Sequence, residues 1–229
     1  MELNIHYRTI IKTMALIIIL LAIMSILGQV YKFTIGYDRY IVDMFDLDTE
    51  GNIPSWYSAI SLFFCSIILL TIGLVKKNVK DKFYLHWIIL SIIFMILSLD
   101  ENCRLHEQSI RPLRNFFNSS GIFYFAWTIP AILLLFFLFF SYLNFLKNLP
   151  TKTRILFLFS GSIFITGAIG GELVGGYYLS LLHQVDNLVY KLIANFEEIF
   201  EMIGVLSFVY TLLDYMSLHL TDLRIRILH

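Results

Sequence analysis

Six stretches of this sequence are about as long and as apolar as a helix must be to cross a bilayer, which takes about 20 mostly apolar residues. They lie at about 13–31, 55–75, 83–99, 121–146, 155–178 and 192–218. Hydrophobic residues make up 58% of the chain and charged residues 15%, which is more apolar surface than one soluble core can hide. The sequence therefore predicts an all-α, polytopic membrane helix bundle of about six transmembrane helices, with residues 1–229 forming a single transmembrane domain.

The distribution of basic residues predicts the orientation of the bundle. Lys and Arg are enriched in the short cytoplasmic loops of membrane proteins. If the N-terminus is inside, the cytoplasmic segments are 1–12, 76–82, 147–154 and 219–229. These segments hold 11 of the 17 basic residues: Arg8, Lys12, Lys76, Lys77, Lys80, Lys82, Lys147, Lys152, Arg154, Arg224 and Arg226. We therefore expect an N-in/C-in protein of the inner (cytoplasmic) cell membrane, with outer loops at 32–54 and 100–120.

Two features bear on the partners of the chain. The formal net charge is zero, so no basic surface for nucleic acid is evident and the lipid bilayer is the expected partner. Gly167, Gly171 and Gly175 recur every four residues in the fifth stretch and therefore share one helix face, where another helix can approach closely. We expect this face to pack within the chain. A homo-oligomer contact or a contact with a membrane partner is the alternative.

The acidic residues are concentrated on the predicted outer side. Only Glu2, Asp81, Asp214 and Asp222 fall on the inner half, so the other 13 of the 17 lie outside or in the outer half of a span. Charge rules for membrane topology do not require this, because Asp and Glu contribute little to them. The outer charged residues that form clusters in or near the spans are Asp100, Glu101, Arg104, His106 and Glu107, then Glu172, then Glu197, Glu198 and Glu201.

Glu201 is the strongest single candidate for a functional residue. Only 15 residues separate Glu198 from Asp214, and they cover about 22 Å of helix at about 1.5 Å per residue. Because the hydrocarbon is about 30 Å thick, Glu201 must lie within the membrane. A carboxylate at that depth is costly and normally faces the interior of the bundle, which makes it a candidate for function.

Three interpretations of the acidic clusters remain open. In the first, the protein is a non-enzymatic subunit, sensor or accessory protein in which the acids pair with Arg104, His106 or Lys191. In the second, they bind a divalent metal (Zn, Fe or Mn), because carboxylates and imidazole from facing helices form such sites. The third is a proton or cation pathway.

The metal interpretation assigns a role to each candidate. Glu101, His106, Glu172 and Glu198 would be ligands, and Glu201 would be a ligand or the general base for hydrolysis or oxidation of a lipid-soluble substrate. The remaining charged residues beside them are Asp100, Arg104, Glu107 and Glu197. If the third helix continues outward, Asp100, Arg104 and Glu107 share a face, and Pro112 ends or bends the helix soon afterwards.

The outer loop before the second stretch has the acidic spacing of a calcium loop at its start. In FDLDTEGNIP, residues 45–54, the twelfth position counted from Asp46 is Tyr57, where a calcium loop needs Glu. We therefore predict a short turn, with weak calcium binding as the alternative. Pro54 fits the first turn of the helix that follows.

Three phrases carry a resemblance to a known family. They are LSLDENCRLHE (97–107), GGELVGGYY (170–178) and EEIFEMIG (197–204). With them the chain resembles an uncharacterised family of bacterial multi-pass membrane proteins, from residue 45 onward. The resemblance implies a membrane location and no particular activity.

Two families of intramembrane enzymes fit less well. CAAX-protease-like enzymes carry Glu-Glu-x-x-x-Arg, and here Glu197 and Glu198 are followed by Met202 at the Arg position. Alkaline-ceramidase-like hydrolases carry a His-x-x-x-His zinc motif, which this sequence lacks. The sequence therefore predicts a site on the outer half of the bundle without naming its reaction.

Overall fold

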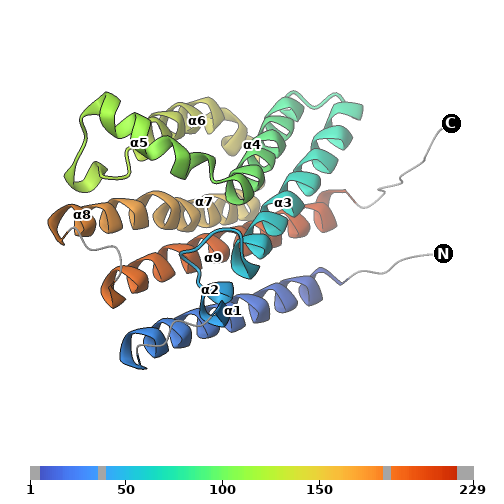
Figure 1. Cartoon of the computed structure of the whole chain (residues 1–229). Helices are drawn as coiled ribbons and strands as arrows, with labels where there is room; N and C mark the ends of the chain where they lie inside the picture. Colours follow the sequence, from blue (N-terminus) through green and yellow to red (C-terminus); the bar gives the residue numbers. More distant parts are fainter. Residues whose placement is uncertain (1–5, 36–39, 183–186, 221–229) are drawn as a thin grey trace.

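The computed structural model describes residues 6–35, 40–182 and 187–220, and this part of the chain folds into helices and loops without strands. The elements are α1 (Tyr7–Ile35), α2 (Tyr40–Phe45), α3 (Ile53–Asn78), α4 (Tyr84–Cys103), α5 (Leu105–Phe117), η1 (Gly121–Phe123), α6 (Thr128–Asn148), α7 (Thr151–Ile165), η2 (Thr166–Gly171), α8 (Glu172–Leu182) and α9 (Leu188–His219) (Figure 1). In the described residues six helical runs are long and apolar enough to cross a membrane, with α7, η2 and α8 counted as one. The all-α class is therefore confirmed for the described residues, and the six long apolar helical runs fit the predicted multi-pass membrane protein.

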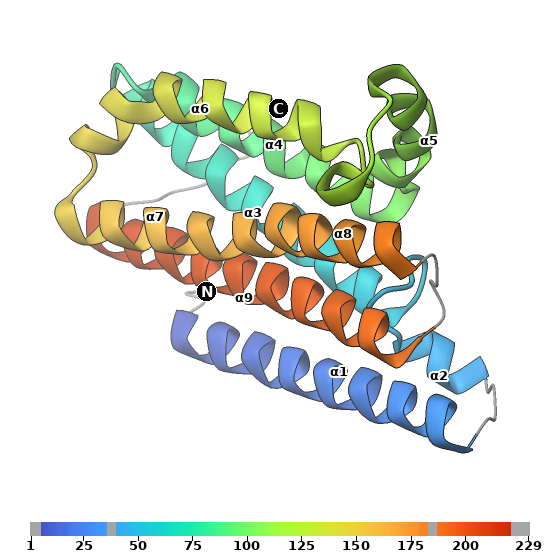
Figure 2. The same cartoon turned by 90° about the vertical axis from the view of Figure 1, so that its left-hand side faces the viewer.

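The longest helix, α9, is the centre of the arrangement. It packs against α1, α3 and the α7–η2 run, while α3 and α4 form a closely packed antiparallel pair. Figures 1 and 2 show α6 running along the outside of this group. The start of α1, the end of α9 and the α3–α4 and α6–α7 connections all lie at one end of the bundle. We call it the connection end; segments 1–5 and 221–229, which entered the charge argument, lie outside the described residues.

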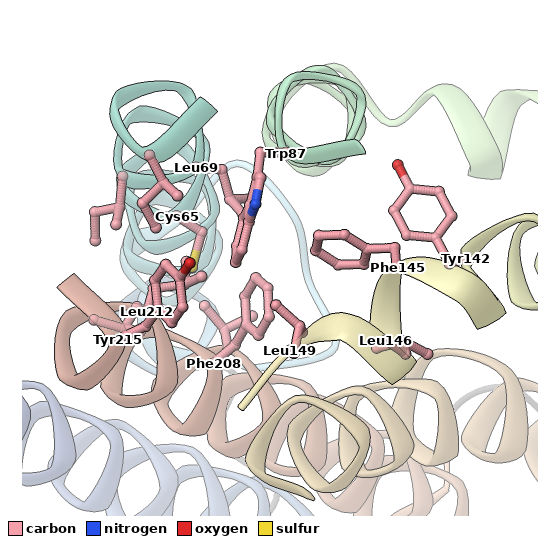
Figure 3. Packing of buried hydrophobic residues seen from close by; sticks show 14 of the residues in the cluster. Cys65, Leu69, Trp87, Tyr142, Phe145, Leu146, Leu149, Phe208, Leu212 and Tyr215 are labelled. Atoms are coloured by element: carbon pink, nitrogen blue, oxygen red, sulfur yellow. The ribbon is translucent and has the colours of Figure 1, made fainter. Parts of the chain in front are cut away.

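An aromatic core holds the helices together near the connection end. The rings of Trp87 and Phe145 have centroids 5.0 Å apart, and those of Trp87 and Tyr215 are 5.1 Å apart. These contacts join α4, α6 and α9, and Cys65 and Leu69 of α3 complete the cluster (Figure 3). Edge-to-face and offset aromatic pairs of this kind stabilise a core beyond the area that they bury.

The fourth span begins later than the sequence indicated. The prediction placed its start at Gly121, whereas α6 begins at Thr128. Gly121 has a φ of 64°, a left-handed conformation in which glycine is not strained, and it opens the short 3-10 turn η1 instead. Residues 121–127 therefore form a folded connection on the opposite side of the bundle from the connection end.

The third helix does not continue outward as a single helix. It ends at Cys103, Arg104 takes a left-handed φ of 55°, and α5 then runs through Pro112 to Phe117. The condition under which Asp100, Arg104 and Glu107 would share one helix face is therefore not met, and the helix does not stop at Pro112. The physical reason is local: an Asp100 side-chain oxygen accepts the backbone N–H of His106 at 2.8 Å and so starts a new helix.

The loop before α3 forms the predicted turn. Asn52 caps α3 by accepting the backbone N–H of Ser55 at 3.2 Å, and the Ser55 hydroxyl accepts the N–H of Asn52 in return. Pro54 lies in the first turn, as predicted, where its missing N–H costs nothing. This reciprocal capping defines where α3 begins.

Candidate functional site

A cavity of about 590 Å³ lies in the half of the bundle away from the connection end, and it collects almost every candidate residue. We call it the acidic cavity. Its charged lining residues are Asp48, Glu50, Asp100, Glu101, His106, Glu107, Glu172, Glu197, Glu198 and Glu201. Arg104 is the one predicted site residue that is not part of the lining. The structure therefore brings together side chains from the 46–52 loop, α4, α5, α8 and α9.

Close packing of η2 against α9 positions two of the glutamates. A Cβ atom added to Gly171 would lie 2.6 Å from Cβ of Glu197, and one added to Gly167 would lie 2.8 Å from Cγ of Glu201. Only glycine allows this approach, which matches the packing within the chain expected for that face. A contact between copies through the same glycines stays a prediction.

The segment that makes this approach is a π-helical turn, Thr166–Gly171, directly before Glu172. Single π turns inside α-helices widen the backbone and are frequent at functional sites. Here the turn places Glu172 at the start of α8, where its side-chain oxygen accepts the indole N–H of Trp127 at 2.9 Å. Trp127 thereby links the loop before α6 to the acidic cavity.

His106 is held by Asp100. Its Nδ1 lies 2.8 Å from an Asp100 oxygen, and its ring packs against Trp127 with centroids 5.1 Å apart. Its other nitrogen, Nε2, lies 3.9 Å from an oxygen of Glu50, which is beyond hydrogen-bond distance. Asp100 thus fixes the orientation of the His106 ring, which lines the cavity, and Nε2 is left without a hydrogen bond to Glu50.

The 46–52 loop lines the cavity at Glu50 and contacts Arg104 there. Arg104 contacts the Glu50 carboxylate at 3.3 Å and also donates to the Glu50 backbone carbonyl. Burial raises the pKa of Glu50 to about 8. The positive charges of His106 and Arg104 lower this pKa, whereas the negative charges of Glu107 and Glu101 raise it further. For His106, burial alone would lower the pKa, but the hydrogen bond and charge of Asp100 outweigh it and raise the pKa to about 9.

These pairs divide the acids into two groups. Asp46 and Asp48 bind Lys191 at 2.8 and 2.6 Å, and Asp100 and Glu50 have the partners described above, as the structural interpretation expects. The other acids of the lining form no ion pair within the described residues: Glu101, Glu107, Glu172, Glu197, Glu198 and Glu201. Glu107 lies on α5, and we call the five on α4, α8 and α9 the glutamate cluster.

The side chains do not by themselves form a metal centre. In the described part of the chain, no three His, Cys, Asp or Glu side chains converge closely enough to hold a metal ion as they are placed. The side chains as placed therefore do not form the predicted metal site, and the acids do not all pair one-to-one with basic residues within the described part of the chain.

Sequence reasoning missed two residues of the site. Glu50 was interpreted only as part of a turn, and nothing in its spacing pointed to Arg104 or His106, which are more than fifty residues away along the chain. Trp127 lies at the edge of an apolar run, and its sequence position gave no signal of a bond to Glu172. Both contacts arise from tertiary packing.

The raised pKa values of His106 and Glu50 predict a pH dependence of stability. A His whose folded pKa of about 9 exceeds its ordinary 6.5 stabilises the fold below pH 6.5, and this contribution is lost as pH rises to about 9. Glu50 acts in the same direction, because its folded pKa of about 8 lies above the ordinary 4.5. We expect the thermal unfolding midpoint in detergent to fall between pH 6.5 and 9, and to fall less steeply in His106→Gln. Equal slopes for the two proteins would contradict the prediction.

The comparisons with known proteins give a family and no activity. No curated protein matches the chain, and no solved structure does. One family model matches residues 13–215, which covers all six candidate spans apart from the helix ends, and its description is a domain of unknown function. The chain therefore belongs to the family of the domain of unknown function DUF8692.

Proposed function

We propose that this protein binds a cation in the acidic cavity, on the outer side of the inner membrane. The observation that carries the proposal is the glutamate cluster, five carboxyl groups that line one cavity and form no ion pair within the described residues. The bias of Lys and Arg toward the connection end supports an N-in/C-in orientation with the cavity outside.

The physical argument rests on the cost of uncompensated charge. Carboxylates removed from water need a compensating positive charge, and without one they remain stable only as neutral acids. Arg104 is engaged by Glu50, Lys191 by Asp46 and Asp48, and His106 by Asp100. One imidazole that already pairs with Asp100 cannot neutralise five further carboxylates. A cation that enters the cavity would displace protons and take their place.

A divalent metal is a second candidate for the occupant, and the arrangement of His106 favours it. Metal-bound histidines commonly donate their other ring N–H to a carboxylate, as the contact between Nδ1 and Asp100 would allow. Zn, Fe or Mn would then bind Nε2 together with Glu101, Glu172 and Glu198 after small side-chain rotations. Glu201 would serve as a ligand or as the general base toward a lipid-soluble substrate.

The test measures proton release when a cation is added to the purified protein in weakly buffered detergent. We expect MnCl₂, ZnCl₂ or n-decylammonium chloride to release protons from the wild type. In Glu201→Gln and Glu172→Gln the dissociation constant should rise roughly tenfold, equivalent to about 1.4 kcal/mol. Asp43→Asn, which removes an exposed acid of α2 outside the cavity, should behave as wild type.

The outcomes separate the candidates. Stoichiometric metal in elemental analysis of the purified protein, lost in both glutamate variants, would support the divalent-metal candidate. If none of the three cations releases protons while the variants remain folded, the proposal of a cation site is wrong. The acids would then act as neutral, structural groups of a subunit, sensor or accessory protein.

A further inference from the structure

The acidic cavity continues into an apolar arm that reaches the lipid-facing surface. Three of its lining residues, from three different helices, are strongly exposed: Ile96 at 54%, Leu134 at 58% and Ile165 at 40%. A cavity whose walls contain such exposed apolar side chains opens toward the surroundings, which are lipid at this depth. The full apolar arm is lined by Ile93, Ile96, Leu97, Leu134, Leu135, Leu138, Phe164, Ile165 and Ala168.

Helix α6 contacts the rest of the bundle near its two ends. Near the connection end, Phe145 packs edge-to-face against Trp87 at a centroid distance of 5.0 Å (Figure 3), and against Phe157 at 6.1 Å. At the other end Thr128 is fully buried, and the neighbouring Trp127 donates to Glu172. Between these points α6 lines the cavity, and Figure 2 shows it beside α4 and running in roughly the same direction as the α7–α8 run.

The polar end of the cavity has aromatic walls as well as carboxylates. Trp127, Tyr190 and Phe125 all line it, and Trp127 hydrogen-bonds Glu172 there. Aromatic faces attract organic cations, and attraction is strongest where water is excluded. Carboxylates beside aromatic rings therefore suit an ammonium group better than a strongly hydrated metal ion.

We infer that the occupant is a lipid-soluble amphiphile with one apolar chain and an amine or quaternary ammonium head. It enters sideways from the bilayer beside α6, places its chain in the apolar arm and its head among the glutamate cluster. This inference rests on the proposed cation site and adds the class of ligand. A volume of about 590 Å³ lies within the usual range of small-molecule pockets and far exceeds the space that a bare ion fills.

Substitutions on α6 test the arm with a matched control. Leu134→Trp fills the arm, whereas Leu133→Trp changes a neighbouring residue that is 67% exposed and is not part of the lining. Binding of n-decylammonium to the protein in lipid nanodiscs is measured by proton release. We expect Leu134→Trp to raise the dissociation constant of n-decylammonium by about tenfold or more, which corresponds to about 1.4 kcal/mol. Leu133→Trp should match the wild type.

A second pair of substitutions, on α4, keeps the inference testable if Leu134→Trp does not fold. Ile96→Trp fills the arm from the opposite wall, and Ile92→Trp, at a position equally exposed at 54% but outside the lining, is its control. Thermal unfolding verifies that each variant is folded. Uncharged n-decanol and chain-free methylammonium serve as probes that lack one half of the proposed ligand.

The results distinguish failure of this inference from failure of the cation site. Weaker decylammonium binding in the two arm variants, with an unchanged MnCl₂ response, supports the inference. Methylammonium that releases protons at the same concentration as decylammonium, or arm variants identical to their controls, overturns the inference. Proton release by MnCl₂ alone also overturns it but leaves the cation site intact, whereas no release by any cation overturns both.

Discussion

Replacing Lys191 with methionine is expected to lower the free energy of unfolding by about 3 kcal/mol or more, the usual result of removing one partner of a buried ion pair. The Lys191 side chain is only 13% exposed, and its ammonium group lies 2.8 Å from Asp46 and 2.6 Å from Asp48. Asp46 itself is almost fully buried, at 2% exposure. Without the lysine, two carboxylates would face each other in a site that water barely reaches.

The measurement is the unfolding midpoint in detergent, with Lys77→Met as the control because Lys77 is exposed. Neutralising the acids should restore much of the loss, so Lys191→Met combined with Asp46→Asn and Asp48→Asn should be more stable than Lys191→Met alone. The interpretation fails if Lys191→Met and Lys77→Met have equal stability. These ion pairs join the 46–52 loop, which lines the acidic cavity at Asp48 and Glu50, to the beginning of α9.

The second large effect is expected for Gly167→Ala. Its new Cβ would lie 2.8 Å from the backbone oxygen of Glu197 and 2.9 Å from the backbone nitrogen of Glu201. Real Cβ contacts are not this short, so η2 and α9 must move apart. Overpacking of this kind typically costs about 1–3 kcal/mol, and here the obstacle is backbone that no rotamer change can relieve.

Gly161→Ala is the matched control for this substitution. Gly161 lies on α7 of the same span, and a Cβ there would meet nothing within 4 Å. Because alanine favours a helix over glycine, we expect Gly161→Ala to be neutral or to stabilise by about 0.5–1 kcal/mol. Gly167→Ala should lower both the unfolding midpoint and the proton release on cation addition. Equal midpoints for the two variants would show that the helices are not in the close contact described.

Much of the architecture could be predicted because the bilayer imposes it. Every spanning segment must satisfy its backbone hydrogen bonds internally and present apolar side chains over a given length, so the spans can be recognised from local sequence. The prediction that Glu201 lies within the membrane rests on helix geometry alone, and the close approach of Gly167 and Gly171 to another helix is confirmed by their contacts with α9. For the same reason the sequence could indicate that the acids lie in one half of the bundle.

The helix boundaries could not be predicted from local sequence where a side-chain contact or a backbone angle changes the direction of the chain. The break at Arg104 depends on the Asp100 side chain capping α5, and the late start of α6 depends on the left-handed Gly121. Around Arg104 the neighbouring residues favour a helix, and after Gly121 the apolar run from Ile122 to Trp127 is typical of the start of a span. In each place a single hydrogen bond or backbone angle decides against the helix.

By itself, the sequence determined that this chain forms a helical membrane bundle with acids embedded in one half. Only the tertiary structure decided which acids have partners: Lys191 binds Asp46 and Asp48, Arg104 binds Glu50, and the glutamate cluster is left around a cavity. The physical reason is that membrane insertion depends on properties of each segment taken alone, whereas ion pairing depends on side chains that are up to 145 residues apart along the chain.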